Sequence, residues 1–329
     1  MRAARLGAPD LGVGIGLRVP HYRAILEDRP PVDFFEIISE NFMVPGGKPR
    51  YHLDRVLESY PVVQHGVSLG IGGPAPPDRA YLTELKALVR RTGAAWVSDH
   101  FCWCGTSGAH LHDLLPLPYT REAVTLVSER ARMVQDFLEV RFALENTSSY
   151  LTYTSSTMPE WEFVAEIVER ADIGLLFDVN NVYVSAYNHG FDPYEFVERV
   201  PADRVVQIHV AGHTHRGTHI VDTHLGPVAG GVWDLYRAAI ARTGPVSTLV
   251  EWDEEIPALA VVLAEAETAR RHRNEAAALG AAASPARTAH GTPDARTKAG
   301  QIDEATTATA WMQGGPRENS GRTTARRRA

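Results

Sequence analysis

The chain has 329 residues, of which 44% are hydrophobic and 22% charged, a balance that excludes a chain disordered throughout and allows one large domain. It contains no run of about 18 uninterrupted apolar residues, and its first ten residues lack the apolar segment of a secretory signal, so we expect a cytoplasmic protein with no membrane partner. The formal charge of −7 divides into +4 on residues 273–329 and −11 on residues 1–272, and such an acidic body is a poor partner for nucleic-acid phosphates, so we expect no nucleic-acid partner.

Eight short apolar runs predict buried strands. They are rich in Val, Ile, Leu and Phe, and several are apolar throughout, as is typical of parallel strands covered on both faces. Glycines at positions 12, 14 and 16 superficially suggest a dinucleotide-binding loop, but the fingerprint spacing and the ribose-binding acid are not convincing, so we predict a tightly packed first strand. The runs occupy residues 12–17, 33–38, 62–67, 95–100, 141–146, 173–178, 204–210 and 247–252.

Helix-like segments alternate with these runs. Many begin with a capping or first-turn residue such as Asp78, Thr120, Pro159 or Asp192. The alternation predicts a (β/α)8 barrel of the TIM type, with an open doubly wound sheet as the alternative. The segments occupy residues 21–29, 50–60, 78–91, 120–138, 158–171, 192–200, 231–243 and 256–271.

Metal-binding residues stand at the ends of six of the strand-like runs. The carboxyl ends of barrel strands meet at one mouth, where barrel enzymes keep their active sites. Asp222 and His224 alternate on an extended loop after the seventh run and can face the same side. Asn181 lies at the start of the loop after the sixth run. It either adds an amide oxygen as a ligand or only stabilises a turn. The candidate ligands are His65, His100, Glu145, Asp178, Asn181, His209, Asp222, His224 and Glu251.

So many donors exceed the needs of one metal ion. They argue for two or three ions that share bridging carboxylates, and Glu145, from the middle of the series, is the natural bridge. Imidazole and carboxylate donors without thiolate suit iron, manganese or zinc, among which iron is the usual choice for activating dioxygen.

Other polar residues have different expected roles. Cys102 and Cys104, the two cysteines, are poorly placed for a disulfide or a zinc knuckle, so we expect small buried residues. We expect outer partners or substrate contacts at Glu36, Glu40 and His189, and solvated loop histidines at His213, His215 and His219.

From Arg273 onward the sequence changes to Ala, Thr, Gly, Arg and Pro. Such a segment has too little to bury to meet the entropy cost of ordering. We therefore expect a metal-binding barrel over residues 1–272 and a disordered basic tail over residues 273–329.

Several motifs resemble one known family, the multinuclear non-heme iron-dependent oxidative enzymes, which includes the iron enzyme of methanobactin biosynthesis. The matching segments extend from residue 12 to about residue 270. The more specific of them are HDLLPLPYT and DVNNVYVSAYNHG, and FFEIISENFM, VSDHFCW and DTHLGPV accompany them.

The resemblance implies a barrel of the xylose isomerase and endonuclease IV type that holds two or three Fe2+/Fe3+ ions and uses dioxygen as co-substrate. It implies a cysteine-containing, ribosomally made precursor peptide as substrate and a separate partner protein that recognises its leader. The nine candidate ligands match the family's ligand set, and His65, Glu145, Asp178, His209 and Glu251 are expected to be catalytic. Two departures are Asp99, where many relatives have Glu, and Thr147, where many have Pro.

Three alternatives remain open. A zinc phosphoesterase of the endonuclease IV type resembles the chain in ligand order but usually has a histidine at the position of Asn181. A sugar isomerase would want a lysine near the metals, and the chain has only Lys48, Lys86 and Lys298. A non-catalytic scaffold predicts a missing ligand, and none is missing.

Overall fold

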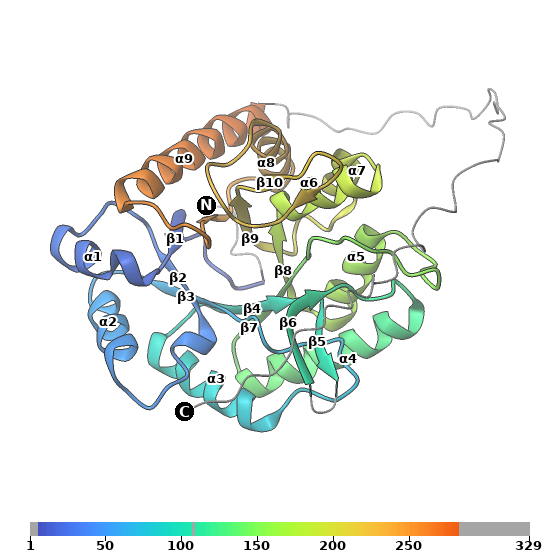
Figure 1. Ribbon diagram of the computed structural model, residues 1–329, viewed down its shortest axis with the longest axis horizontal. Helices are drawn as coiled ribbons and strands as arrows, with labels where there is room; N and C mark the ends of the chain where they lie inside the picture. Colours follow the sequence, from blue (N-terminus) through green and yellow to red (C-terminus); the bar gives the residue numbers. More distant parts are fainter. Residues whose placement is uncertain (1–5, 107–108, 283–329) are drawn as a thin grey trace, which may run out of the picture. The chain divides into compact units, whose positions relative to one another are not determined.

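Eight parallel strands close into a barrel in the computed structural model, which describes residues 6–106 and 109–282 (Figure 1). Each predicted strand is present, and each pairs with its neighbours in the order β1-β12-β9-β8-β7-β4-β3-β2. The predicted TIM-type barrel is confirmed, and the open sheet is wrong. The strands are β1 (Val13–Gly16), β2 (Phe35–Ile38), β3 (Val62–His65), β4 (Trp96–His100), β7 (Arg141–Glu145), β8 (Gly174–Asp178), β9 (Val205–Ala211) and β12 (Ser247–Glu251).

Helices surround the barrel where the sequence predicts them. Asp78, Thr120 and Asp192 cap α3, α4 and α7 through their side chains, whereas Pro159 occupies the cap position of α5 without a side-chain bond. The helices are α1 (Tyr22–Asp28), α2 (Lys48–Leu57), α3 (Arg79–Thr92), α4 (Arg121–Leu138), α5 (Glu160–Ala171), α6 (Val179–His189), α7 (Pro193–Arg199), α8 (Gly230–Thr243) and α9 (Leu259–Ala282), with short 3-10 turns η1 (Val19–His21) and η2 (Ser39–Asn41).

Helix α6 corrects one expectation, because a loop was predicted directly after β8. Asp178 caps this helix by accepting a hydrogen bond from the backbone N–H of Asn181 at 2.7 Å. Asn181 therefore lies in the first turn of a helix, and His189 is its last residue. The β-branched, Asn and Tyr residues of the segment have low helix propensity, so the cap and the burial of the helix against the barrel decide its conformation.

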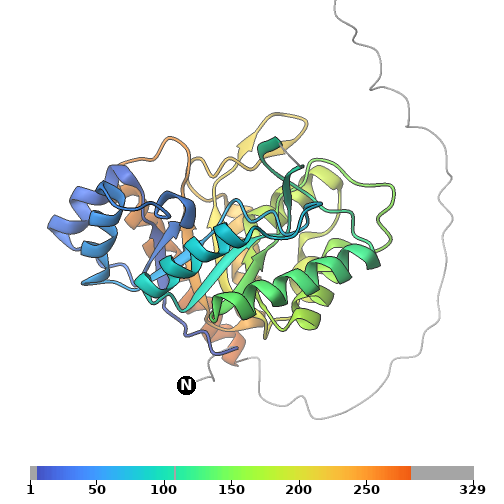
Figure 2. The same cartoon turned by 90° about the horizontal axis from the view of Figure 1, so that it is seen from below.

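Two hairpins project from the end of the barrel toward which the strands point (Figure 2). They are β5 (Trp103–Thr106) with β6 (Ala109–Leu115), and β10 (Thr214–His215) with β11 (Ile220–Val221). The sequence did not indicate either hairpin.

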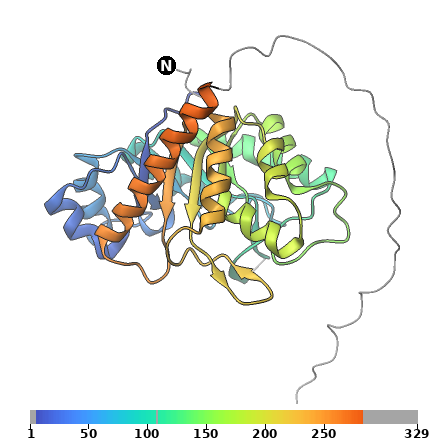
Figure 3. The same cartoon turned by 90° about the horizontal axis from the view of Figure 1, so that it is seen from above.

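At the C-terminal side, α8 and α9 lie along the outside of the strands (Figure 3). The expected tail boundary at residue 273 falls inside α9, and the rest of the expected tail, residues 283–329, lies outside the described residues. In the part of the chain that the structure describes, every helix is too short or too polar to cross a membrane.

The lower interior of the barrel is an apolar floor. Six strands contribute one floor residue each, and Phe34, directly before β2, adds a seventh. All seven are buried: Phe34, Val63, Trp96, Ala143, Leu176, Val206 and Leu249. The first strand contributes Gly14, where an added Cβ would lie 2.7 Å from the Phe34 ring. Gly14 thus leaves space for the Phe34 ring and Gly16 for the Arg18 side chain, which confirms the tightly packed first strand.

A polar layer lies directly above this floor. Because side chains of a strand alternate between its two faces, a residue two positions after a floor residue also points into the barrel. Six floor residues are followed in this way by Glu36, His65, Ser98, Glu145, Asp178 and Glu251, all buried. Because of the two-residue period of a strand, the polar side chains near the strand ends all point into the barrel and form one layer.

Strand β9 reaches the same layer through an irregularity. Leu175 and Leu176 of β8 pair with Val205 and Gln207, so Val206 has no partner in the ladder. This bulge changes the phase of the strand and lets His209 face inward although Val206 belongs to the floor.

Candidate metal centre

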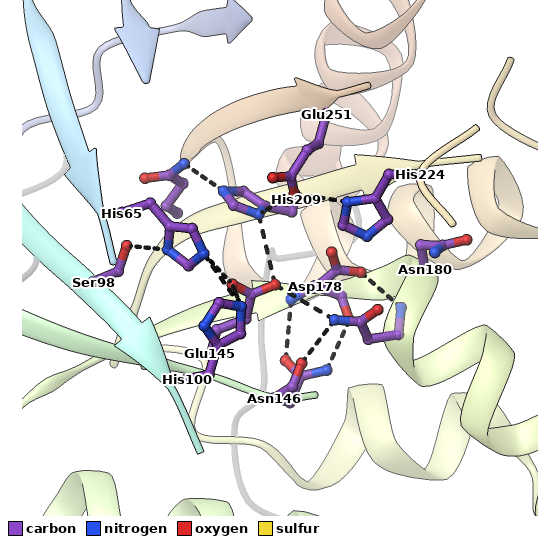
Figure 4. A network of polar contacts seen from close by, with 12 residues as sticks. His65, Ser98, His100, Glu145, Asn146, Asp178, Asn180, His209, His224 and Glu251 are labelled. Atoms are coloured by element: carbon purple, nitrogen blue, oxygen red, sulfur yellow. Dashed lines mark hydrogen bonds and ion pairs between the residues drawn. The ribbon is translucent and has the colours of Figure 1, made fainter. Parts of the chain in front are cut away.

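Three donor atoms from three adjacent strands meet at one side of the polar layer. His65 Nε2 lies 3.3 Å from His100 Nε2, and Glu145 Oε2 lies 3.2 Å and 3.4 Å from these two nitrogens. Atoms bound to one ion at about 2.0–2.2 Å lie about 3.0–3.5 Å apart, so this triangle has the size of a metal site. Ser98 Oγ contacts His65 Nδ1 at 2.9 Å, which leaves Nε2 directed at the other two donors (Figure 4).

His209 occupies the middle of the layer. Its Nδ1 lies 3.0 Å from Glu251 Oε2 and 3.6 Å from Glu145 Oε1. On the opposite side of the ring, Nε2 lies 3.3 Å from Glu36 Oε2 and 2.8 Å from Gln207 Nε2. Of these two groups only the Glu36 carboxylate can accept a proton from Nε2, because the Gln207 amide nitrogen is itself a donor and donates to Glu36 Oε2 at 2.6 Å. With its proton on Nε2, His209 has the Nδ1 lone pair free for a metal, the usual arrangement of a ligating histidine with an outer carboxylate.

Amide side chains fix the carboxylates at the ends of β7 and β8. The Asn146 amide donates to the carbonyl of Asp178 at 2.8 Å and accepts from its backbone N–H at 3.0 Å. The Asn181 amide nitrogen donates to Asn146 O at 3.0 Å and contacts Glu145 Oε1 at 3.4 Å. These contacts direct the Asn181 carbonyl oxygen away from the backbone, where it makes no hydrogen bond.

The third part of the layer comes from the loop after β9. His224 Nε2 lies 2.9 Å from Asp222 Oδ1, and His224 Nδ1 lies 3.1 Å from Asp253 Oδ2 and 3.4 Å from Glu251 Oε2. The backbone of His224 has a φ of 47°, a left-handed conformation that is uncommon outside glycine. Such a conformation is typical of functional sites.

Arg18 adds a largely buried cation that the sequence analysis missed. Its guanidinium pairs with Asp253 and lies 3.6 Å from Glu251 Oε1. Burial opposes ionisation, but His224 and Arg18 hold the pKa of Asp253 well below its usual range. Arg18 stands two positions after β1, so the same strand-end rule would have found it had the search included cations.

Several buried donor atoms of the layer make no well-formed hydrogen bond, although three of them, Glu145 Oε2, His209 Nδ1 and His224 Nε2, lie 2.9–3.4 Å from an imidazole or a carboxylate. The five atoms are Glu145 Oε2, Asp178 Oδ2, Asn181 Oδ1, His209 Nδ1 and His224 Nε2. An unsatisfied buried polar atom is costly, so a convergent set calls for an unseen partner. Metal cations would satisfy all five at once.

Overlapping groups of donors indicate more than one metal position. Among the described residues, four groups of three have donor atoms within 4.8 Å of one another, and none contains cysteine. Glu145, Asp178, His209 and Glu251 each belong to two groups. The groups are His65–His100–Glu145, Glu145–Asp178–His209, Asp178–His224–Glu251 and Glu36–His209–Glu251.

Neighbouring charges and burial also shift the pKa values of several residues in the polar layer. Burial lowers the pKa of His100, but Glu145 and Asp99 outweigh it and raise the pKa to about 9. Burial and the neighbouring Glu145 raise the pKa of Asp178 well above its usual range. Clustered perturbed groups of this kind are typical of functional sites.

A cavity of about 200 Å³ opens onto the layer. Ligand candidates form its floor, and Leu114, Thr147, Ser148 and Tyr150 form its sides. Ser148 Oγ donates to Asp222 Oδ2 at 3.0 Å, so this wall is tied to the candidate ligands. The space suits one small side chain rather than a large ligand.

The structure brings all nine predicted residues to this layer, and their role as ligands remains a prediction. Glu36 lies against His209, as expected of an outer partner. Glu40 instead holds the loop after β3 through Val67 N and the Tyr81 hydroxyl, and His189 contacts Ser149.

The structure confirms the expectations for the two cysteines and for two of the three loop histidines. Cys102 and Cys104 are free and buried, as predicted. His215 and His219 are exposed, but His213 contacts Asn180 Oδ1 at 2.8 Å and stacks on Tyr183, so its assignment as a solvated histidine was wrong.

Comparisons with known sequences find one matching protein family and several similar proteins. The profile of the family described as "RiPP precursor modification enzyme MbnB/TglH/ChrH" matches residues 12–274. A UPF0276 protein of Caulobacter vibrioides is 52% identical over 263 residues, covering 80% of this chain and 94% of that protein. Another, from Anaeromyxobacter sp., is 50% identical over 271 residues, covering 82% and 95%.

Solved structures share the barrel. An L-ribulose 3-epimerase aligns with a TM-score of 0.55 at 15% identity, covering 84% of this chain and 99% of that one. Endonuclease IV from Thermus thermophilus aligns with a TM-score of 0.53 at 17% identity, covering 81% and 99%. At such low identity these similarities concern the fold alone.

Proposed function

Because the chain belongs to the MbnB/TglH/ChrH family of RiPP precursor modification enzymes, we propose that it uses two or three iron ions and dioxygen to oxidise cysteine residues of a ribosomally synthesised precursor peptide. Family membership makes it an enzyme that acts on a peptide. It also favours this activity over the phosphoesterase, isomerase and scaffold alternatives.

The position of Glu145 carries the proposal. One of its oxygens faces His65 and His100, and the other faces His209. A carboxylate so placed supports a bridge between two ions, which is the basis of multinuclear chemistry. The ligand sets would be His65, His100 and Glu145 for one ion, Glu145, Asp178 and His209 for a second, and Asp178, His224 and Glu251, with Asn181 and Asp222 nearby, for a third.

Iron held by these residues would supply the one-electron and dioxygen chemistry that side chains lack. The donor set is compatible with iron because it consists of imidazole, carboxylate and amide oxygen. Protein thiolates are absent from the donor groups of the described residues, which leaves the soft ligand to the cysteine of the substrate.

The surrounding residues would orient the ligands and admit the substrate. Ser98 and the Glu36–Gln207 pair fix the rings of His65 and His209, and Asn146 fixes the end of β8. The small cavity between Leu114 and Tyr150 would admit a cysteine side chain and exclude most of the bulk water. A separate protein that recognises the leader would deliver the peptide to this mouth.

Anaerobic reconstitution tests the proposal. The protein is loaded with Fe2+ and incubated with short cysteine-containing peptides encoded beside its gene, each synthesised with its leader, with and without the neighbouring recognition protein. We expect a change of peptide mass only after dioxygen is admitted, and none when the cysteine is replaced by serine. An unchanged mass with the metal sites filled with iron would contradict the proposal, as would cleavage of a phosphodiester by zinc-loaded protein.

A further inference from the structure

A second pocket, of about 250 Å³, lies in the loops at the same end of the barrel. The loop before α4, the loop after β7, the start of α5 and the segment after α6 line it. Its lining is mostly apolar and rich in aromatic rings: Leu117, Tyr119, Leu151, Tyr153, Trp161 and Phe191. None of these residues belongs to the candidate metal centre.

A single segment, residues 147–151, separates this pocket from the metal cavity. Thr147, Ser148 and Tyr150 line the metal cavity, whereas Ser149 and Leu151 line the second pocket. From Ser148 to Leu151 successive side chains thus point to opposite sides, as is typical of an extended backbone. The wall between the two spaces is therefore one chain thick.

Hydrogen bonds hold this wall in place from both sides. Ser149 N donates to Ser185 Oγ at 3.1 Å, and Ser149 Oγ contacts His189 Nε2 at 2.9 Å. On the other side, Ser148 Oγ donates to Asp222 Oδ2 at 3.0 Å. A fixed wall gives the two pockets a fixed separation, which a bound molecule can match.

The rim between the pockets is apolar and accessible. Tyr150 is 52% exposed and Leu151 45% exposed, although both are large apolar residues. Leu114 lines the metal cavity, and Leu117, three residues later, lines the second pocket. A chain that enters the metal cavity thus has an apolar path into the neighbouring pocket.

The size and lining of the second pocket select an aromatic occupant. A cavity of about 150 Å³ lined by apolar side chains already accepts benzene, so the larger pocket accepts one aromatic side chain. Rings such as Trp161 and Phe191 favour another ring in edge or offset contact. Ser149, Thr152, Ser156, Glu160 and His189 add polar groups to this lining. Burial raises the pKa of Glu160 to about 7 despite a hydrogen bond from Tyr119.

We propose that this pocket binds an aromatic side chain of the precursor peptide about three residues from the modified cysteine. The inference rests on the proposed function, because it takes the peptide to be the molecule in the metal cavity. Three extended residues span about 10 Å, enough for a bound peptide to cross from one side of a single chain to the other. The pocket would then set which cysteine enters the metal centre.

Equilibrium binding of short peptides tests this proposal without turnover. The full chain is loaded with Fe2+ and kept anaerobic, and the probe is the fluorescein-labelled peptide Phe-Gly-Gly-Cys-Gly-Gly-Phe. It is compared by fluorescence anisotropy with peptides that carry Ala or Lys in place of both Phe residues. We expect the Phe peptide to bind about tenfold more tightly than the Ala peptide.

A matched pair of variants locates the effect. Leu151→Asp places a charge at the edge of the pocket and should abolish the preference for Phe over Ala. Val261→Asp, at a residue 48% exposed in the first turn of α9, should leave the preference unchanged. Both sites are partly exposed, so neither variant should prevent folding.

Equal affinities for the Phe and Ala peptides in the unaltered protein would overturn the proposal, as would tighter binding of the Lys peptide. A preference for Phe that appears only after removal of residues 283–329 would assign the pocket to the chain's own C-terminal segment and overturn it too. Replacing Cys by Ser in the probe examines the proposed function separately. If that change costs no affinity while the Phe preference remains, the cysteine function fails and the aromatic pocket is supported.

Discussion

The apolar floor and the polar layer are built by the same strands, two residues apart, yet they differ in how well their side chains are packed and paired. The floor fills its space with complementary side chains, from Trp96 to Leu249, and exposes none of them. The layer above gathers carboxylates and imidazoles, several of which have no hydrogen-bond partner. The first region contributes mainly to stability, and the second holds the groups to which we assign the chemistry.

The difference teaches where this barrel tolerates substitution. Removing a floor residue leaves a cavity, whereas neutralising a carboxylate in the polar layer can relieve repulsion among buried charges. Strand β8 carries both cases, since Leu176 belongs to the floor and Asp178 to the layer.

Asp178→Asn should have the largest effect on function. The amide cannot replace a shared anionic ligand, so we expect metal content to fall and product formation to drop by more than the about 10- to 100-fold cost of losing an outer partner. Because burial and Glu145 raise the pKa of Asp178, the uncharged amide should leave the metal-free protein equally or more stable, and Asn also caps a helix well. Metal analysis, peptide mass spectrometry and urea unfolding measure the three quantities. Full activity in this variant would refute the assignment.

Leu176→Ala should show the opposite pattern. The substitution creates a cavity in the floor, and we expect the free energy of unfolding to fall by about 2–5 kcal/mol. Metal content per folded chain should be unchanged. Urea denaturation of the metal-free protein gives the first value, and a loss of bound metal larger than the loss of folded protein would show that the two regions are not separable.

Glu36→Gln should have an intermediate effect on metal binding. The amide keeps a polar contact with His209 but removes the charge that holds the Nε2 proton, so we expect metal affinity to fall about tenfold. Glu40→Gln is the matched control, because Glu40 contacts Val67 and Tyr81 and no candidate ligand. Titration with Mn2+ compares the two variants, and equal affinities would remove Glu36 from the centre.

The pH dependence of metal binding should be the smallest effect. In the metal-free protein the pKa of His100 is raised to about 9, so at neutral pH a metal must displace its proton. Raising the pH toward 9 removes this competition, and we expect the contribution of His100 to increase apparent affinity about tenfold per pH unit, then level off. Calorimetric titration with Mn2+ in two buffers of different ionisation enthalpy measures the released proton. An affinity independent of pH between 7 and 9 would contradict this role.

Much of the site follows from the strand period alone. The eight strands are apolar enough to recognise, and the candidate ligands at the ends of six of them converge because every closed parallel barrel brings these ends together. Ser98 and Gln207 lie two residues before a candidate ligand, and Asp253 lies two residues after one, but their contacts with the candidate ligands became evident only in the structure.

Other features depend on tertiary structure. The bulge in β9 arises from register with β8, and helix α6 forms from weak helix formers because Asp178 caps it and the barrel packs against it. The aromatic pocket joins residues from four separate segments, and although two of these segments overlap recognisable motifs, nothing in the sequence indicates that they meet in one pocket.

Anomalous diffraction at the iron absorption edge, from crystals of the protein loaded anaerobically with Fe2+, tests the multinuclear centre most directly. We expect two or three anomalous peaks inside the polar layer, with one beside His65, His100 and Glu145 and a second that shares Glu145. A single peak, or peaks away from Glu145, would contradict a centre bridged by this residue.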